Sequence, residues 1–77
     1  MIRTIRGIDP NVLLMEQLER LICERTGGGI QSLQVDIQPS EVILRGQTKR
    51  YYNKQLATHA VQDLLEERSL ANEIEVV

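Results

Sequence analysis

The sequence predicts an α+β fold, a two-layer sandwich with the element order α-β-β-α-β. Two segments repeat apolar residues every three or four positions, which is the spacing of amphipathic helices. Three shorter segments are β-branched or alternate apolar and polar residues, as strands with one buried face do. Glycine, proline and polar residues separate these segments. We therefore expect a three-stranded sheet, mixed or antiparallel, with two helices packed on one face.

The first helix is predicted from about Pro10 to Arg25. Asp9 provides a side-chain acceptor at the N-cap, and proline follows at a position where its missing N–H costs nothing. The run Gly27-Gly28-Gly29 ends the helix, because glycine readily takes the left-handed conformation of a C-cap. The apolar stripe of this helix comprises Leu14, Leu18, Leu21 and Ile22.

Two strands joined by a turn are predicted next. The segment Gln38–Glu41 has the composition of a turn, and the β-branched run Val42–Arg45 after it is the second strand of a hairpin. We predict that this strand ends at Gly46, where the chain bends toward the second helix. The first strand alternates apolar and polar residues, and its apolar members are Leu33, Val35 and Ile37.

The second helix is predicted to begin between Thr48 and Tyr51, with Thr48 as a candidate cap, and to end near Arg68-Ser69. The last strand, Leu70–Val76, again alternates apolar and polar residues. The second helix is therefore the crossover that returns the chain to the sheet. Its apolar face is expected to comprise Tyr52, Leu56, Ala57, Ala60, Val61, Leu64 and Leu65. The sheet face away from the helices is expected to be polar, with Gln34, Asp36, Gln38, Arg45, Glu73 and Glu75.

Composition narrows the class of protein. A length of 77 residues allows one domain with one thin hydrophobic core. The contents of 42% hydrophobic and 26% charged residues are those of an ordinary soluble domain. A single cysteine, Cys23, excludes an internal disulfide. Because no run is long enough for a signal peptide or a transmembrane helix, we expect a cytoplasmic protein unless the chain has been trimmed.

No pattern in the sequence indicates catalysis. The glycine run Gly27-Gly28-Gly29 follows a helix and precedes a strand, whereas a phosphate-binding loop leads from a strand into a helix. His59 and Asp63 share a helical flank but supply fewer ligands than a zinc site needs. Cys23 has no cluster of cations and no local histidine that would activate its thiol. We therefore expect no catalytic residue, no metal site and no cofactor.

The strongest functional signal is a block of positive charge. Residues 42–62 contain four bases and no acid, in a chain whose net charge is -2. Tyr51 lies off the predicted apolar face, so its ring is expected to be exposed among these cations. A solvated helix start would explain the same cluster without any ligand. The candidate ligand-binding residues are Arg45, Gly46, Lys49, Arg50, Tyr51 and Lys54.

Three local patterns, in this order and spacing, resemble the BON domain family of small α/β modules. They are a strand ending in glycine (Val42–Gly46), small residues along a helix (Gln55–Ala57 and Ala60) and a last strand of the form apolar-x-Asn-x-apolar-x-Val (Leu70–Val76). The resemblance covers residues 10–77 of a single domain, with residues 1–8 as an N-terminal extension. Where family members have a glycine and an apolar residue before the last strand, this chain has Glu67–Leu70.

The resemblance implies a non-catalytic binding module without a cofactor, linked in the family to phospholipid surfaces and to protein or hydrophobic partners. We therefore expect the basic start of the second helix to bind an anionic phospholipid surface or an acidic protein partner. The alternative is a structural or assembly domain that self-associates through edge strands or through residual apolar surface such as Leu13 and Ile43. Nucleic-acid binding is disfavoured, because the pI is about 5.3 and the C-terminal segment is acidic.

Overall fold

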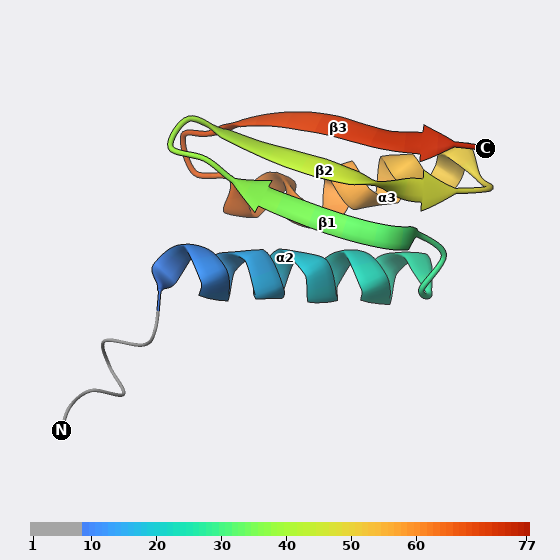
Figure 1. The fold of residues 1–77 in the computed structure, drawn as a ribbon, viewed down its shortest axis with the longest axis horizontal. Coiled ribbons are helices and arrows are strands. Elements are labelled where there is room, and N and C mark those ends of the chain that lie inside the picture. Colours follow the sequence, from blue (N-terminus) through green and yellow to red (C-terminus); the bar gives the residue numbers. More distant parts are fainter. Residues whose placement is uncertain (1–8) are drawn as a thin grey trace, which may run out of the picture.

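The computed structural model describes residues 9–77 (Figure 1). The element order confirms the predicted α-β-β-α-β arrangement. The N-terminal extension predicted at residues 1–8 lies outside the described residues. The elements are α2 (Pro10–Thr26), β1 (Gln31–Ile37), β2 (Glu41–Thr48), α3 (Tyr51–Val61), the 3₁₀ turn η1 (Gln62–Leu64) and β3 (Ser69–Val76).

The sheet is mixed, and β2 is its central strand. β1 pairs with β2 in antiparallel orientation, and β3 pairs with β2 in parallel orientation. The two-residue turn Pro39-Ser40 closes the hairpin, where the Gln38 N–H donates to the Glu41 carbonyl at 2.8 Å. Because parallel strands need a crossover connection, α3 runs back behind the strands, while α2 lies alongside β1 (Figure 1).

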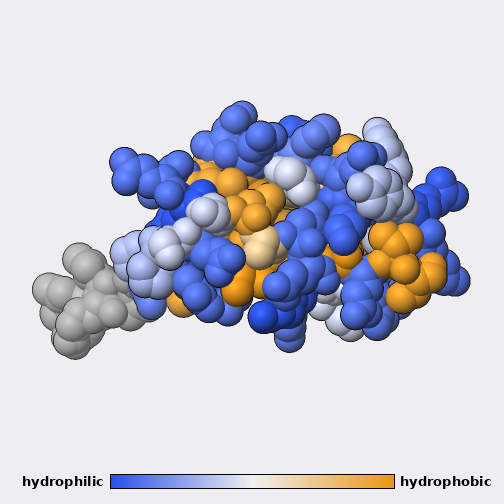
Figure 2. Space-filling model, turned by 90° about the horizontal axis from the view of Figure 1, so that it is seen from above, coloured by the Kyte–Doolittle hydropathy of each residue, from blue (hydrophilic) through white to orange (hydrophobic). Residues whose placement is uncertain are grey.

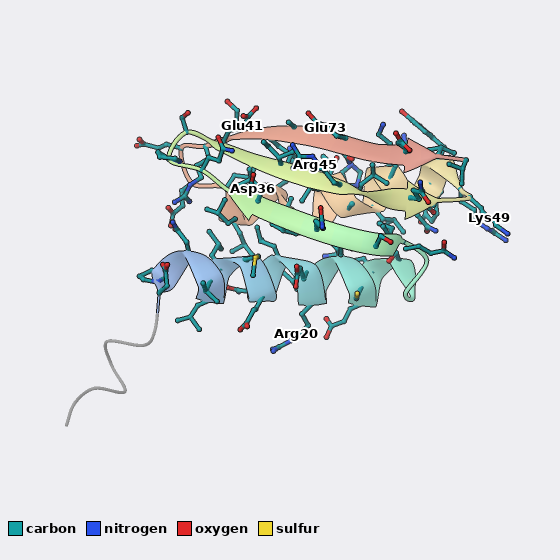
Figure 3. All side chains as sticks on the ribbon, in the orientation of Figure 1. Arg20, Asp36, Glu41, Arg45, Lys49 and Glu73 are labelled. Atoms are coloured by element: carbon teal, nitrogen blue, oxygen red, sulfur yellow. The ribbon has the colours of Figure 1, made fainter. Side chains whose placement is uncertain are left out.

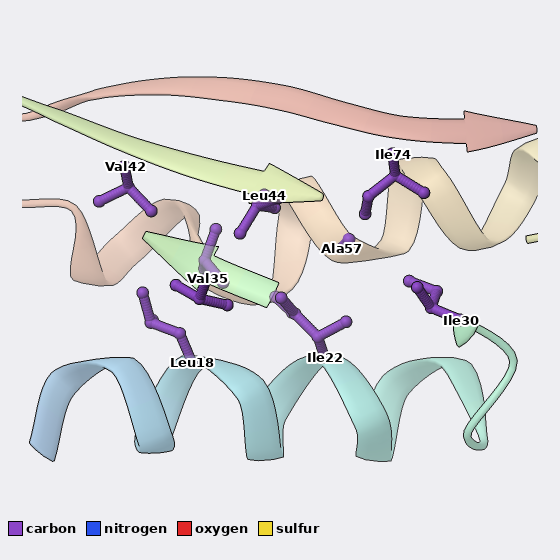
Figure 4. Close-up of a cluster of buried hydrophobic side chains, with 10 residues drawn as sticks. Leu18, Ile22, Ile30, Val35, Val42, Leu44, Ala57 and Ile74 are labelled. Carbon is purple, nitrogen blue, oxygen red and sulfur yellow. The ribbon is translucent and has the colours of Figure 1, made fainter. Parts of the chain in front are cut away.

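The core forms between one sheet face and both helices, as predicted (Figure 4). From α2, only Leu18 and Ile22 are completely buried, four residues apart on one face. Each such aliphatic side chain contributes about 1.5–3 kcal/mol to stability through burial, so a core this small depends on each of its members. Its remaining buried members come from the loop before β1, from the three strands and from α3: Ile30, Val35, Val42, Leu44, Ala57, Ala60, Val61 and Ile74.

The predicted caps of α2 are confirmed. The Asp9 carboxylate accepts a hydrogen bond from the backbone N–H of Asn11 at 2.9 Å. Gly27 has the left-handed φ of 62°, and the helix ends at Thr26, one residue later than predicted. The following Gly28 N–H donates to the Cys23 carbonyl at 3.0 Å, which satisfies a carbonyl of the last turn.

The prediction that the second strand ends at Gly46 is wrong. β2 continues to Thr48, and Gly46 pairs with Ile74 inside the β2–β3 ladder. Across from it, β1 carries one extra residue between Gln31 and Gln34, so its backbone bulges toward Gly46. A Cβ at residue 46 would lie 3.0 Å from the Gln31 carbonyl oxygen, and its φ is 154°. Glycine is therefore required here by a close backbone approach and not by a bend.

The second helix ends earlier than predicted. α3 stops at Val61, and η1 and a turn follow, in place of a helix that reaches Arg68-Ser69. A 3₁₀ turn repeats every three residues, so the apolar spacing continues through it and resembles one long helix in the sequence. Glu66 then takes a left-handed φ of 61°, which turns the chain toward β3 without a glycine.

Two expectations about the start of α3 are also wrong. Thr48 is not its N-cap, because Arg50 holds that position without a side-chain cap. Tyr52 does not face the core, since it is 64% exposed. The first turn of α3 lies behind the ends of β2 and β3, at the end of the sheet (Figure 1).

The sheet face away from the helices is polar, as predicted. Arg45 lies at its centre, and its Nε is 3.3 Å from Glu73 Oε1 on the neighbouring strand. Ile43 also points to this face, but only 8% of it is exposed. Its neighbours in the sheet are Asp36 and Ala71.

Asn72 joins α3 to β3. Its Nδ2 donates to the Lys54 carbonyl at 2.9 Å and to Thr58 Oγ1 at 2.8 Å. Its Oδ1 accepts from the backbone N–H of Ile74 at 3.1 Å. Because Ile74 is 1% exposed, no water would replace this bond. This asparagine therefore provides a hydrogen-bond acceptor for the Ile74 N–H of β3 and holds α3 against that strand.

We predict that Gly46→Ala lowers the free energy of unfolding by about 3 kcal/mol, because it adds steric overlap to an unfavourable backbone conformation. Gly28→Ala is the matched control, since Gly28 also has a positive φ but its Cβ would meet nothing within 4 Å. The control is expected to lose only about 1–2 kcal/mol. Urea denaturation of both variants measures the difference, and equal losses would contradict the close approach.

We predict that Asn72→Ala lowers the free energy of unfolding by about 2–3 kcal/mol, because the substitution leaves the buried Ile74 N–H without a partner and removes both bonds from Asn72 to α3. Asn11→Ala removes the same side chain from an exposed site on α2 and is expected to change stability by less than about 0.5 kcal/mol. Thermal and urea unfolding of the pair provide the comparison. A loss as small as that of the control would show that Asn72 does not hold α3.

Candidate ligand-binding surface

One end of the molecule gathers exposed cationic, aromatic and aliphatic side chains. Two segments meet there: the β2–α3 connection with the first turn of α3, and the end of β3. Figure 2 shows hydrophobic residues beside hydrophilic ones at this right-hand end. Tyr51 is 61% exposed, as predicted, and Val77 is 68% exposed. We call this surface the basic tip, and it consists of Lys49, Arg50, Tyr51, Tyr52, Val76 and Val77.

Thr48 positions the basic tip. It is the last residue of β2 and is 2% exposed. Its Oγ1 accepts from the Arg50 backbone N–H at 3.3 Å and from Asn53 Nδ2 at 3.1 Å, which ties the connection to α3. Its carbonyl accepts from the Val77 N–H at 2.8 Å, which holds the end of β3 beside it. One buried threonine thus brings the two segments of the tip together.

The structure brings four of the six predicted site residues to this end. Lys49, Arg50 and Tyr51 belong to the tip, and Lys54 lies one turn further along α3, where it is partly buried. Arg45 does not join them, because it lies on the helix-free sheet face beside Glu73. Gly46 does not present a binding group either, since the β1 backbone passes over it.

Sequence reasoning missed three residues of the tip. Tyr52 fits the three-and-four spacing of the helix and was therefore expected in the core. Val76 and Val77 end a strand, and their exposure depends on how far the helix covers that strand. No local pattern indicates the exposure of Tyr52, because its spacing fits the apolar face and Tyr51 was already expected off that face.

The cations of the tip are not explained by helix stability. The N-cap Arg50 makes no side-chain cap, and the first turn of α3 contains no acidic residue. Positive side chains at a helix N-terminus gain nothing from the helix dipole, whose positive end lies there. A local arrangement that opposes a stabilising rule is typical of a functional surface.

A cleft of about 310 Å³ adjoins the tip. It separates the glycine loop after α2 from the β2–α3 connection, so its walls are mostly backbone and uncharged amides. Among the side chains that line it, those of Lys49 and Arg50 are charged. The cleft is lined by Gly28, Gly29, Gln31, Gln47, Thr48, Lys49, Arg50, Asn53 and Val77.

Within residues 9–77, no three His, Cys, Asp or Glu side chains gather closely enough to hold a metal ion. Neither helix of the described chain is long and apolar enough to cross a membrane. Comparison with protein-family models, curated proteins and solved structures finds no match for this chain. The basic tip is therefore the main basis for a functional proposal.

Proposed function

We propose that this chain is a non-catalytic binding module, similar in kind to BON domains, that attaches to anionic phospholipid surfaces through the basic tip. One observation carries the proposal: two cations, two exposed tyrosines and two exposed valines lie together at one end of the molecule. Phospholipid surfaces combine negative headgroups with an apolar layer beneath them. The tip offers a partner for each.

The physical chemistry of the tip suits a bilayer surface. Each Lys or Arg near an anionic membrane contributes about 1 kcal/mol of attraction. Tyrosine is enriched at membrane interfaces, because its ring enters the apolar layer while its hydroxyl stays hydrated. Val76 and Val77, exposed by 44% and 68%, add aliphatic area that becomes buried on contact. The result is weak, reversible binding that depends on salt.

A bilayer suits the tip better than an acidic protein does. A stable protein interface buries about 800 Å² on each partner, whereas the tip consists of six residues at the end of an elongated domain. A membrane needs no matched shape and is contacted by such a small convex end. Nucleic acid remains disfavoured, because the three cations near the start of α3 belong to a chain of net charge -2.

Self-association through edge strands finds little support. Val35, in the middle of edge strand β1, is 5% exposed, and Ile74, in the middle of edge strand β3, is 1% exposed. The Ile74 N–H is already bonded to Asn72. Each edge therefore presents no continuous ladder of free groups for another strand. Of the two apolar residues considered for self-association, Ile43 is covered, whereas Leu13 on α2 is 52% exposed.

We predict that Lys49→Gln with Arg50→Gln weakens binding to anionic vesicles by about 30-fold, because two contributions of about 1 kcal/mol are lost. The measurement is co-sedimentation with vesicles of neutral lipid, with and without an anionic lipid. Arg20→Gln is the matched control, since Arg20 is exposed on α2 and points away from the tip (Figure 3). It is expected to bind like the unmodified chain.

A second double variant tests how much the two tyrosines contribute to vesicle binding. Tyr51→Ala with Tyr52→Ala is expected to weaken binding to the same vesicles and to leave its salt dependence unchanged, because no charge is removed. If the unmodified chain binds neither anionic nor neutral vesicles, the proposed function is wrong. If the tyrosine variants bind normally, attraction to a charged surface alone accounts for the binding.

A further inference from the structure

The uncovered face of the sheet is acidic. Four carboxylates and one guanidinium point to it, so it carries three negative charges. Arg45 offsets only part of this charge through its contact with Glu73, which is 3.3 Å long and about half exposed on both sides. Figure 3 shows Asp36, Glu41, Arg45 and Glu73 spread along the three strands in front of the helices. The carboxylates are those of Asp36, Glu41, Glu73 and Glu75.

This face is also hollowed. A depression of about 480 Å³ lies between the strands near the middle of the sheet. Gly46 contributes no side chain to it, and the Ser32 bulge of β1, with a φ of 55°, forms one border. Apart from Gly46, every residue that lines it has a polar or charged side chain. The lining residues are Ser32, Gln34, Arg45, Gly46, Gln47, Glu73 and Glu75.

The same chain carries the complementary surface. Lys49, Arg50 and Lys54 place three positive charges at and beside the basic tip. In the part of the chain that the structure describes, the other cations are placed differently. Arg20 and Arg25 lie on α2 among acidic residues, and Arg68 donates to the Gln38 carbonyl at 3.0 Å. The two exposed cations of the tip, with Lys54 beside them, are thus opposite in sign to the net charge of the sheet face.

We propose that the acidic sheet face of one copy receives the basic tip of a second copy. Within one copy the two surfaces cannot meet, because Lys49 projects from the end of the ribbon while the carboxylates lie along its side (Figure 3). In the complex, Lys49 and Arg50 face the row around Glu73 and Glu75. Tyrosine side chains from the tip lie over the hollow beside Gly46.

This contact is head-to-tail. Each added copy leaves one free tip and one free sheet face, so association continues and does not stop at a closed dimer. Its strength comes from opposite charges at an exposed surface, so it weakens strongly as salt screens them. The contact uses the tip but not lipid. An anionic surface therefore competes with the second copy for the same cations.

The test is charge reversal at each surface. Lys49→Glu with Arg50→Glu reverses the tip, and Asp36→Lys with Glu75→Lys reverses the face. Analytical ultracentrifugation at low salt is expected to show a mass that rises with concentration for the unmodified chain and a constant monomer for either variant. An equimolar mixture of the two variants is expected to associate again, because each then meets an opposite charge. This recovery also shows that both variants are folded.

The control variant places the same charge change elsewhere. Glu16→Lys with Glu24→Lys alters exposed positions on α2 and is expected to associate like the unmodified chain. Raising the salt to about 0.5 M is expected to dissociate every associating sample. A monomer at all concentrations, a closed dimer of fixed mass, or association that survives both reversals would each overturn the proposal.

Two further outcomes separate this contact from other possibilities. Binding of a lysine-rich peptide to the face, without self-association, would show that a foreign basic segment is the occupant, and would overturn the proposal. The face-reversed variant retains the whole tip, so it is expected to bind anionic vesicles at least as well as the unmodified chain. An unmodified chain that stays monomeric but binds anionic vesicles would overturn this inference alone, whereas one that self-associates but binds no vesicles would overturn the proposed function alone.

Discussion

The structure depends on one constraint. β2 must form hydrogen bonds with β1 on one side and with β3 on the other, while the side chains on its helix-facing side pack in the core. Val42 and Leu44 are completely buried there, against both helices. The same strand must pass the bulge of β1, and only glycine at residue 46 allows the two backbones to approach so closely. Because β2 then continues to Thr48, the end of β3 and the start of α3 come together at that residue. The position of the basic tip follows from this pairing.

The charges of the chain follow the same geometry. β2 and β3 direct alternate residues away from the helices, so Arg45, Glu73 and Glu75 lie on one uncovered face. Lys49 and Arg50 come after the strand ends, where alternation no longer applies. The small domain therefore has an acidic side and a basic end although its net charge is only -2. Net charge alone conceals this separation.

Most of the fold could be predicted from the sequence, because its signals are local. The caps of α2 depend on Asp9 and Gly27 alone, and strand alternation identifies the polar face around Arg45. The predictions were wrong where two different local structures produce the same sequence pattern. A 3₁₀ turn after Val61 continues the apolar pattern of a helix. At Gly46, a glycine that relieves a close approach has the same appearance in the sequence as one that ends a strand.

By itself, the sequence determined the order of elements, the caps of α2, the polar face of the sheet and the block of cations, since each depends on neighbours along the chain. Only the tertiary structure decided which cations lie near one another. It separated Arg45 from Lys49, exposed Tyr52 and placed Val76 and Val77 beside the start of α3. These outcomes depend on the parallel pairing of β3 with β2 and on where α3 begins relative to the end of the sheet. Both are set by contacts between residues more than twenty positions apart, such as Val77 with Thr48.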